Sequence, residues 1–342
     1  MSYDKAAYIE KAKLMKEEAI AMVDNILTSY KIHPEKIAEA FAFGKNFYNY
    51  SPRNMLLIQN QHKGATYVQS FAAWKKLDAN VKKGAKGIKI LVPMEVKYLT
   101  NSDHSVWIRK SEATEEQMKL FQSGKLIESQ QTHFGIGNVF DIGQTNYPKE
   151  KYPELYHMGY QDEALHSVLQ GVIEFAKEKL GCKVEIEDLE SIALRGSFTP
   201  SKNKITLNNK LEDSHALSTM LHELGHAIMH KSVRNGKSEA QIEFEADALS
   251  VMMEASCGIS LTDTRKEHMI SHYRNLEKQY SEHMKEKLEE VFKTVFHAYK
   301  ENIEELQISI EKELHLNPTM FSPYKEPVVV KGVVPSLPQL HK

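Results

Sequence analysis

The sequence has few cysteines, no long hydrophobic run and no excess of charge of one sign. Only Cys182 and Cys257 are present, in unrelated contexts, which excludes a disulfide framework and a thiolate zinc cluster and favours a reducing compartment. The apolar runs are too short to span a bilayer, and the charged N-terminus lacks the apolar segment of a signal peptide. We therefore predict a cytoplasmic protein with no membrane partner.

The net charge of −2 hides a basic segment. Residues 51–100 contain nine basic and two acidic residues, so their local charge is +7, and such asymmetry indicates different partners for different segments. Aromatic residues lie between the lysines, a combination typical of surfaces that follow phosphates and stack on single-stranded bases. The alternative is that the aromatic residues, Trp74 above all, are core and the lysines are only solvated. The predicted DNA contacts are Tyr50, Arg53, Asn54, Tyr67, Lys75, Lys76, Lys82, Lys83 and Lys86.

Hydrophobic periodicity predicts an α+β fold. N-terminal helices are followed by a small antiparallel sheet, and a mostly helical second part has a short sheet and a long C-terminal helical region. The predicted helices cover 4–30, 34–48, 52–60, 70–77, 161–181, 213–231, 238–256 and 264–313, the last as one helix or a pair. The predicted strands cover 87–99, 107–110, 135–145 and two within 196–210, and residues 111–129 are a charged excursion. The predicted divisions are 1–150, 151–316 and a Pro-rich extended tail at 317–342.

A His-Glu-Leu-Gly-His motif lies at 222–226. On a helix, His222 and His226 differ by about 40° in direction and about 6 Å along the axis, so both imidazoles can meet one ion. Glu223 lies on the adjacent face, where it can reach a water rather than the metal. We predict a Zn²⁺ site with Glu223 as the catalytic base that takes a proton from water and returns it to a leaving amine. The alternative is a helix that merely carries histidines.

The next predicted helix offers a third ligand. Glu243 and Asp247 are four residues apart and share a face, whereas Glu245 points elsewhere. Glu243 would complete a His₂Glu set with an open fourth position, the arrangement of catalytic zinc. Asp247 could accept a hydrogen bond from a liganding histidine and fix its tautomer. The alternative is that these carboxylates form only a solvated face.

His230 and the strand pair flank this motif. His230 is about 12 Å along the axis from His222, too far to share one ion. We predict that it interacts with free carbonyls at the helix C-terminus. An edge strand within 197–207 could hold an extended peptide by strand addition.

Several short blocks of the N-terminal part carry a family resemblance: Tyr50-Ser51, Asn54, Leu56–Ile58, Ser70-Phe71, Trp74, Val81–Ile88 and Asn138–Thr145. On these residues the N-terminal part resembles the ArdC-like antirestriction proteins and their LtrC-like relatives of conjugative plasmids, integrative elements and phages. The resemblance covers roughly 35–315 and implies that the N-terminal domain binds single-stranded DNA.

The C-terminal part resembles a small gluzincin of the IrrE/ImmA type. The matching stretches are Gly196–Asn208, His222–His226 and Glu243–Asp247. The resemblance implies a gluzincin-like metallopeptidase domain with His222, His226 and Glu243 on zinc and Glu223 in catalysis.

Together, these patterns predict a single-stranded-DNA-binding zinc metallopeptidase of a mobile element or phage, of the antirestriction or DNA-protection type. Its partners would be single-stranded DNA and an unidentified protein substrate. One alternative is a non-peptidase DNA-masking protein with a vestigial zinc site, against which the intact Glu223 argues. The other is an ImmA-like regulatory peptidase that cleaves a repressor.

Overall fold

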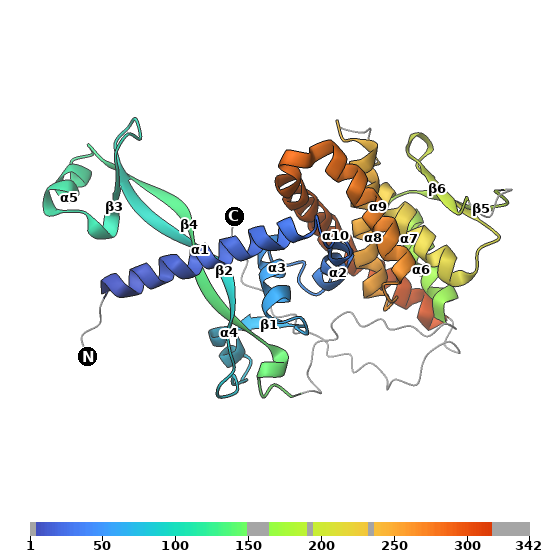
Figure 1. Ribbon diagram of the computed structural model, residues 1–342, viewed down its shortest axis with the longest axis horizontal. Helices are drawn as coiled ribbons and strands as arrows, with labels where there is room; N and C mark the ends of the chain where they lie inside the picture. The colour runs from blue at the N-terminus through green and yellow to red at the C-terminus, as the bar shows by residue number, and fades with distance from the viewer. Residues whose placement is uncertain (1–4, 149–163, 190–193, 232–235, 317–342) are drawn as a thin grey trace.

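The computed structural model describes residues 5–148, 164–189, 194–231 and 236–316 (Figure 1). The predicted division between residues 150 and 151 and the predicted Pro-rich tail lie outside these ranges. The fold is α+β, as predicted, with a long strand pair, a small second sheet and many helices. No helix in the described ranges is long and apolar enough to cross a membrane.

Two of the N-terminal helices begin where the sequence supplies a serine cap. Ser51 and Ser70 each accept a hydrogen bond from a backbone N–H of the following turn, which satisfies an otherwise unpaired donor. Pro52 occupies the first turn, where its missing N–H costs nothing. The helices are α1 (Lys5–Ser29), α2 (Glu35–Gly44), α3 (Pro52–Gln61) and α4 (Phe71–Lys76).

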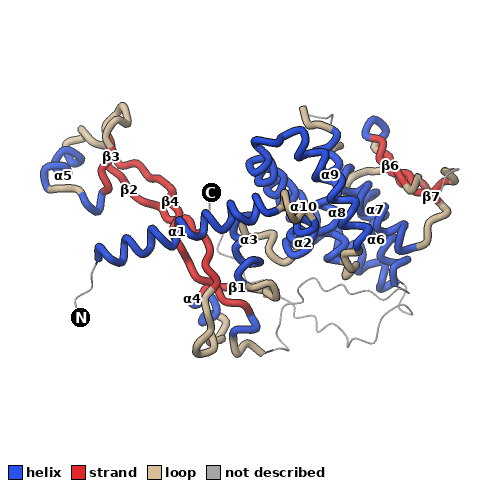
Figure 2. The backbone as a smooth tube through the Cα atoms, viewed as in Figure 1, coloured by secondary structure: helices blue, strands red, loops and turns tan. Residues whose placement is uncertain are grey.

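A long antiparallel pair forms most of the first sheet. Strands β2 (Ile88–Thr100) and β4 (Ile127–Asp141) pair along their whole length, and the sheet order is β1-β4-β2-β3. The pair extends away from the helical body, and α1 lies across it (Figures 1 and 2). Strand β1 (Val68–Ser70) is at one edge, and β3 (Trp107–Arg109) lies near the far end with α5 (Glu115–Gln122).

The structure corrects the predicted excursion at 111–129 and the predicted strand at 135–145. Helix α5 begins there at a capping box between Thr114 and Gln117, and β4 starts at Ile127 rather than near 135. The outer half of β4 is polar and partly exposed, so its sequence lacks a clean alternation. Its strand conformation depends on the ladder with β2, which local pattern does not reveal.

The C-terminal part packs helices beside a three-stranded sheet of order β5-β7-β6. Strand β5, which the sequence pattern did not predict, is short, charged and largely exposed, and it pairs in parallel with β7. The predicted helical region at 264–313 is two helices that are separated by a 3-10 turn. The elements are α6 (Leu165–Glu178), β5 (Lys183–Glu187), β6 (Gly196–Thr199), β7 (Lys204–Asn208), α7 (Asp213–Met229), α8 (Glu239–Ser256), α9 (Asp263–Tyr280) and α10 (Met284–Leu316).

One buried apolar cluster contains residues of α1 to α3 and of α6 to α10. Phe41 of α2 stacks on Phe292 of α10 with ring centroids 4.3 Å apart, and it meets Phe244 of α8 edge-on. Arg53 of α3 donates to both carboxylate oxygens of Glu289 on α10, at 2.8 and 2.9 Å. The N-terminal helices therefore support the helices that carry the metal-binding motif, and the division near residue 150 stays a prediction.

Candidate metal centre

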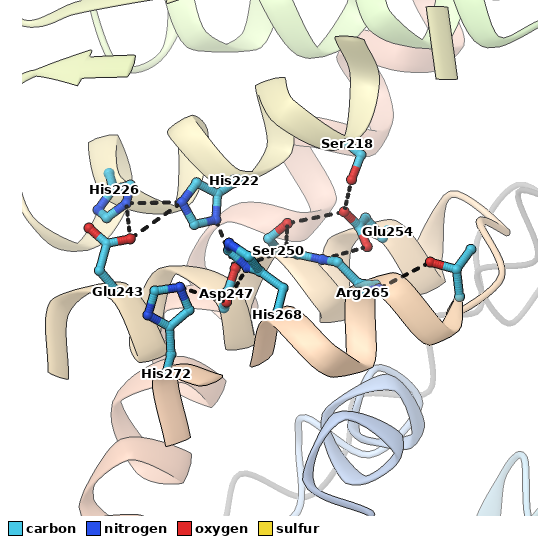
Figure 3. A network of polar contacts seen from close by, with 11 residues as sticks. Ser218, His222, His226, Glu243, Asp247, Ser250, Glu254, Arg265, His268 and His272 are labelled. Carbon is cyan, nitrogen blue, oxygen red and sulfur yellow. Dashed lines mark hydrogen bonds and ion pairs between the residues drawn. The ribbon is translucent and has the colours of Figure 1, made fainter. Parts of the chain in front are cut away.

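The site forms where α7 and α8 approach closely. Gly225 makes this approach possible, because a Cβ at that position would lie 2.9 Å from the carbonyl oxygen of Ala246. Ala246 and Ala248 are fully buried and add little bulk at the contact. The small residues bring His222 and His226 of α7 opposite Glu243 of α8 (Figure 3).

The three predicted ligands converge on one point. His222 Nε2 lies 3.2 Å from His226 Nε2 and 3.7 Å from Glu243 Oε2, and His226 Nε2 lies 3.5 Å from the same oxygen. Ligand atoms of a tetrahedral zinc, each at about 2.0–2.1 Å from the ion, are roughly 3.3 Å apart. The observed spacing fits a divalent metal held by these three side chains.

Asp247 supports His222 from behind. Its Oδ1 lies 2.9 Å from His222 Nδ1 and accepts a hydrogen bond from Arg265 at 2.8 Å. Burial alone would raise the pKa of Asp247, but the Arg265 charge and the contacts with His222 and His268 hold that pKa well below its usual value. The carboxylate is therefore ionised at neutral pH and orients the His222 ring so that Nε2 faces the metal position.

The surroundings of His222 stabilise positive charge. Burial would lower the pKa of this imidazole, yet contacts with Asp247 and Glu243 raise it to about 10. The same contacts with His222 and His226 hold the pKa of Glu243 below its usual range, against the effect of burial. A metal ion between these side chains would also place positive charge beside the carboxylates. The donor set therefore fits a metal ion electrostatically as well as geometrically.

Glu223 is buried at the edge of the metal position. Burial raises the pKa of its carboxyl, partly offset by the charges of His222 and His226 and by a backbone hydrogen bond from Phe198. It borders a pocket of about 410 Å³ that also contains the three ligands and residues of β6. A carboxylate with a raised pKa beside a metal position has the properties of a general base.

His230 differs from the sequence expectation, whereas Glu245 points away from the metal ligands, as predicted. His230 is the C-cap of α7, but its ring contacts a side chain rather than free carbonyls, because Nε2 lies 3.0 Å from Glu245 Oε2. Glu245 is not solvated: it is fully buried and also accepts hydrogen bonds from Lys237 and Gln241. The contact of His230 with Glu245 joins α7 to α8, so the spacing within one helix could not predict it.

Helix α9 contributes groups that the sequence reasoning missed. Arg265 and His268 contact Asp247 directly, and His272 lies 3.7 Å from it. The available signal was the spacing of His268 and His272, which share a helix face because they are four residues apart. Only the packing of α9 on α8 brings that face to the site.

Several predicted DNA contacts lie within the fold. Tyr50 is largely buried, which raises its pKa to about 12, and its hydroxyl donates to the carbonyl of Val68. Asn54 is buried and exchanges two hydrogen bonds with the backbone of Leu91. We assign structural roles to Tyr50 and Asn54, because their polar groups are engaged by backbone atoms.

The remaining predicted contacts differ in accessibility. Arg53 is half exposed but paired with Glu289, and Tyr67 packs edge-on against the buried Trp74. The five predicted lysines are exposed on α4 and on the turn that leads to β2: Lys75, Lys76, Lys82, Lys83 and Lys86. Lys82 donates to the carbonyl of Gly143. The prediction of a DNA-binding surface therefore rests on this lysine group.

Two domain families match the chain. Residues 16–128 match the N-terminal domain of anti-restriction factor ArdC, and residues 177–259 match the IrrE N-terminal-like domain, a metallopeptidase family. Residues 16–128 are thus similar to an ArdC N-terminal domain, and residues 177–259 are similar to an IrrE-like, metallopeptidase-type domain. This confirms the resemblance inferred from the sequence.

Individual proteins are also similar to the chain. An uncharacterized protein of Bacillus anthracis is 28% identical over 285 residues, which cover 77% of this chain and 48% of that protein, so the chain spans about half the length of this relative. Two crystal structures of the antirestriction ArdC protein from the R388 plasmid are also similar. The metal-free structure has a TM-score of 0.49 and 18% identity, and the Mn(II)-bound structure has 0.44 and 17%; each match covers 85% of this chain and 97% of the other.

Proposed function

We propose that the C-terminal part is a zinc-dependent peptidase. The observation that carries this proposal is the convergence of His222, His226 and Glu243 in one pocket with Glu223 and the strand β6. Two imidazoles and one carboxylate suit zinc and leave a coordination position for chemistry. A structural zinc site would be closed and would have no use for Glu223.

The residues of the site have separate roles in the proposed hydrolysis. Zinc, when bound by His222, His226 and Glu243, supplies a Lewis acid that polarises a carbonyl and makes water more acidic. Glu223 takes a proton from the attacking water and passes it to the leaving amine. Its raised pKa suits both steps, because the carboxylate must accept the proton and the carboxylic acid must release it. The backbone N–H of Phe198 orients the carboxylate.

The substrate we propose is an extended segment of a protein. Within the described ranges, β6 pairs only with β7, so its other edge has no strand partner. Gly196, Ser197 and Phe198 of this strand line the pocket beside Glu223. A peptide that adds to this edge as a strand would have its backbone held by main-chain hydrogen bonds next to the metal position.

Cleavage of an unfolded protein such as casein tests the peptidase proposal. Glu223→Gln should retain zinc and lose at least about 100-fold in rate, because a general base contributes about 10²–10⁴-fold. His226→Ala should lose both zinc and cleavage. Glu286→Gln, an exposed acidic position on α10, serves as the matched control. Wild-type rates in Glu223→Gln would refute the role of that residue, and a zinc-loaded but inactive wild type would favour the DNA-masking alternative.

For the N-terminal part, we propose binding to single-stranded DNA in protection of a mobile element or phage genome. The exposed lysine group between α4 and β2 and the match to the ArdC N-terminal domain support this proposal. Lysines that follow phosphates contribute affinity without sequence preference. A regulatory peptidase that cleaves a repressor would instead show peptidase activity without DNA affinity.

An anisotropy titration across salt concentrations tests DNA binding. Each phosphate contact contributes about 0.7 to the slope of log affinity against log salt, so Lys83→Ala/Lys86→Ala should flatten it by about 1.4. Lys278→Ala/Lys300→Ala removes two exposed lysines of α9 and α10 as the control. An equal effect of both pairs, or no preference for single over double strands, would exclude a specific role for the lysine group.

A further inference from the structure

A second group of metal-binding side chains lies beside the first. His268 and His272 of α9 both face Asp247 of α8 (Figure 3). His268 Nδ1 lies 2.9 Å from Asp247 Oδ2, and His272 Nε2 lies 3.7 Å from the same oxygen. The three ligand atoms all lie within 4.8 Å of one another. The two distances to Oδ2 bracket the roughly 3.3 Å that separates ligands of a tetrahedral zinc.

The two oxygens of Asp247 serve different neighbours. Oδ1 meets His222 and Arg265, whereas Oδ2 meets His268 and His272. The Arg265 charge is also shared with Glu254, whose Oε2 lies 3.3 Å from the guanidinium. The Arg265 guanidinium therefore faces Asp247 Oδ1 and Glu254. Asp247 Oδ2 remains available to a metal cation.

We propose that Asp247, His268 and His272 form a second divalent-metal site, which binds an ion through Asp247 Oδ2, His268 Nδ1 and His272 Nε2. Two histidines and one carboxylate suit zinc, cobalt or iron in the divalent state and leave positions open to water. The site is reachable, because the His268 side chain is 52% exposed while Asp247 is fully buried. An ion here would join α9 to α8 at the level of the first site.

The shared carboxylate couples the two ions. A cation on Oδ2 draws electron density from Oδ1, which weakens its support of His222 and lowers the basicity of that ligand. The second ion should therefore reduce the affinity of the first, and the coupling must act equally in both directions. If His268 and His272 were only hydrogen-bond partners of Asp247, the chain would bind no second equivalent of metal and would show no such coupling.

Equilibrium dialysis of the full chain against Co²⁺, with the absorption spectrum of the ion as a second readout, tests the proposal. The wild type should bind a second equivalent that His268→Ala/His272→Ala loses while it keeps the first. His226→Ala should lose the first equivalent and keep the second. Failure of the first site is therefore distinguishable from failure of the second. His297→Ala, an exposed histidine on α10, should bind as the wild type does.

A milder variant keeps the test informative if the double variant does not fold. His268→Ala alone, at a half-exposed position, should raise the Kd of the second equivalent by at least about tenfold, since even partners outside the ligand set contribute that much. Saturation of the wild type at a single equivalent would overturn the proposal. Retention of the second equivalent by the folded double variant, or its loss in His297→Ala, would overturn it equally.

Discussion

Replacing Asp247 with asparagine should weaken binding of the first metal ion while leaving all of its ligands in place. Asparagine keeps the size of the side chain and one acceptor oxygen but removes the negative charge 2.9 Å from His222 Nδ1. Loss of such a supporting partner reduces metal affinity about 10–100-fold, which corresponds to about 1.4–2.7 kcal/mol. We expect the Kd of the first equivalent of zinc to rise by this factor.

The same change should also destabilise the fold. Asp247 is fully buried and pairs with Arg265, whose side chain is 13% exposed. Breaking a buried pair costs about 3–5 kcal/mol, and we expect the lower end because Arg265 keeps its contacts with Glu254 and Ser250. The folded-state pKa of Asp247 lies below the unfolded-chain value of about 3.9. The contribution of ionised Asp247 to stability is therefore complete above a pH of about 3.9 and is lost as pH falls through the folded-state pKa.

Glu245→Gln is the matched control for this prediction. Glu245 is another fully buried carboxylate of α8, but it pairs with His230 and Lys237 rather than with His222. Both variants should lower the midpoint of urea unfolding at pH 7, while only Asp247→Asn should raise the Kd in competition with a chromophoric chelator. Equal loss of metal affinity in the two variants, or an unchanged Kd in Asp247→Asn, would refute the role assigned to Asp247.

Three further outcomes are expected. Gly225→Ala should cost about 1–3 kcal/mol in urea unfolding and weaken metal binding, because its Cβ would press on Ala246 and displace the helix that carries Glu243; wild-type stability would contradict this. A double-mutant cycle on Arg53 and Glu289 should give a coupling of at most about 1 kcal/mol, since Arg53 is 42% exposed; a clearly larger coupling would contradict this. A chelator should lower the Tm of the zinc-loaded chain, because free zinc at 100 times its Kd adds about 2.7 kcal/mol, and it should lower the Tm of His226→Ala by less, because this variant lacks the first site; an equal fall in both would contradict the role of His226.

Helical spacing was sufficient to predict how the metal ligands are arranged within each helix. His222 and His226, like Glu243 and Asp247, project from one face because the α-helix repeats every 3.6 residues. The N-caps at Ser51 and Ser70 are local in the same sense, because each side chain accepts a hydrogen bond from the next turn of chain. The fold class and the resemblance to two domain families could likewise be inferred from sequence patterns.

Tertiary structure decided which side chains meet across elements. Tyr50 and Asn54 lie in a basic, aromatic segment that suggested a DNA surface, yet their partners are backbone atoms of Val68 and Leu91. The pairing of Glu245 with His230 and the contacts of α9 with Asp247 also join residues that are separate in sequence. Local periodicity determines the direction of a side chain within its own helix or strand. Its burial and its partners depend on how those elements pack together, which no short window of sequence contains.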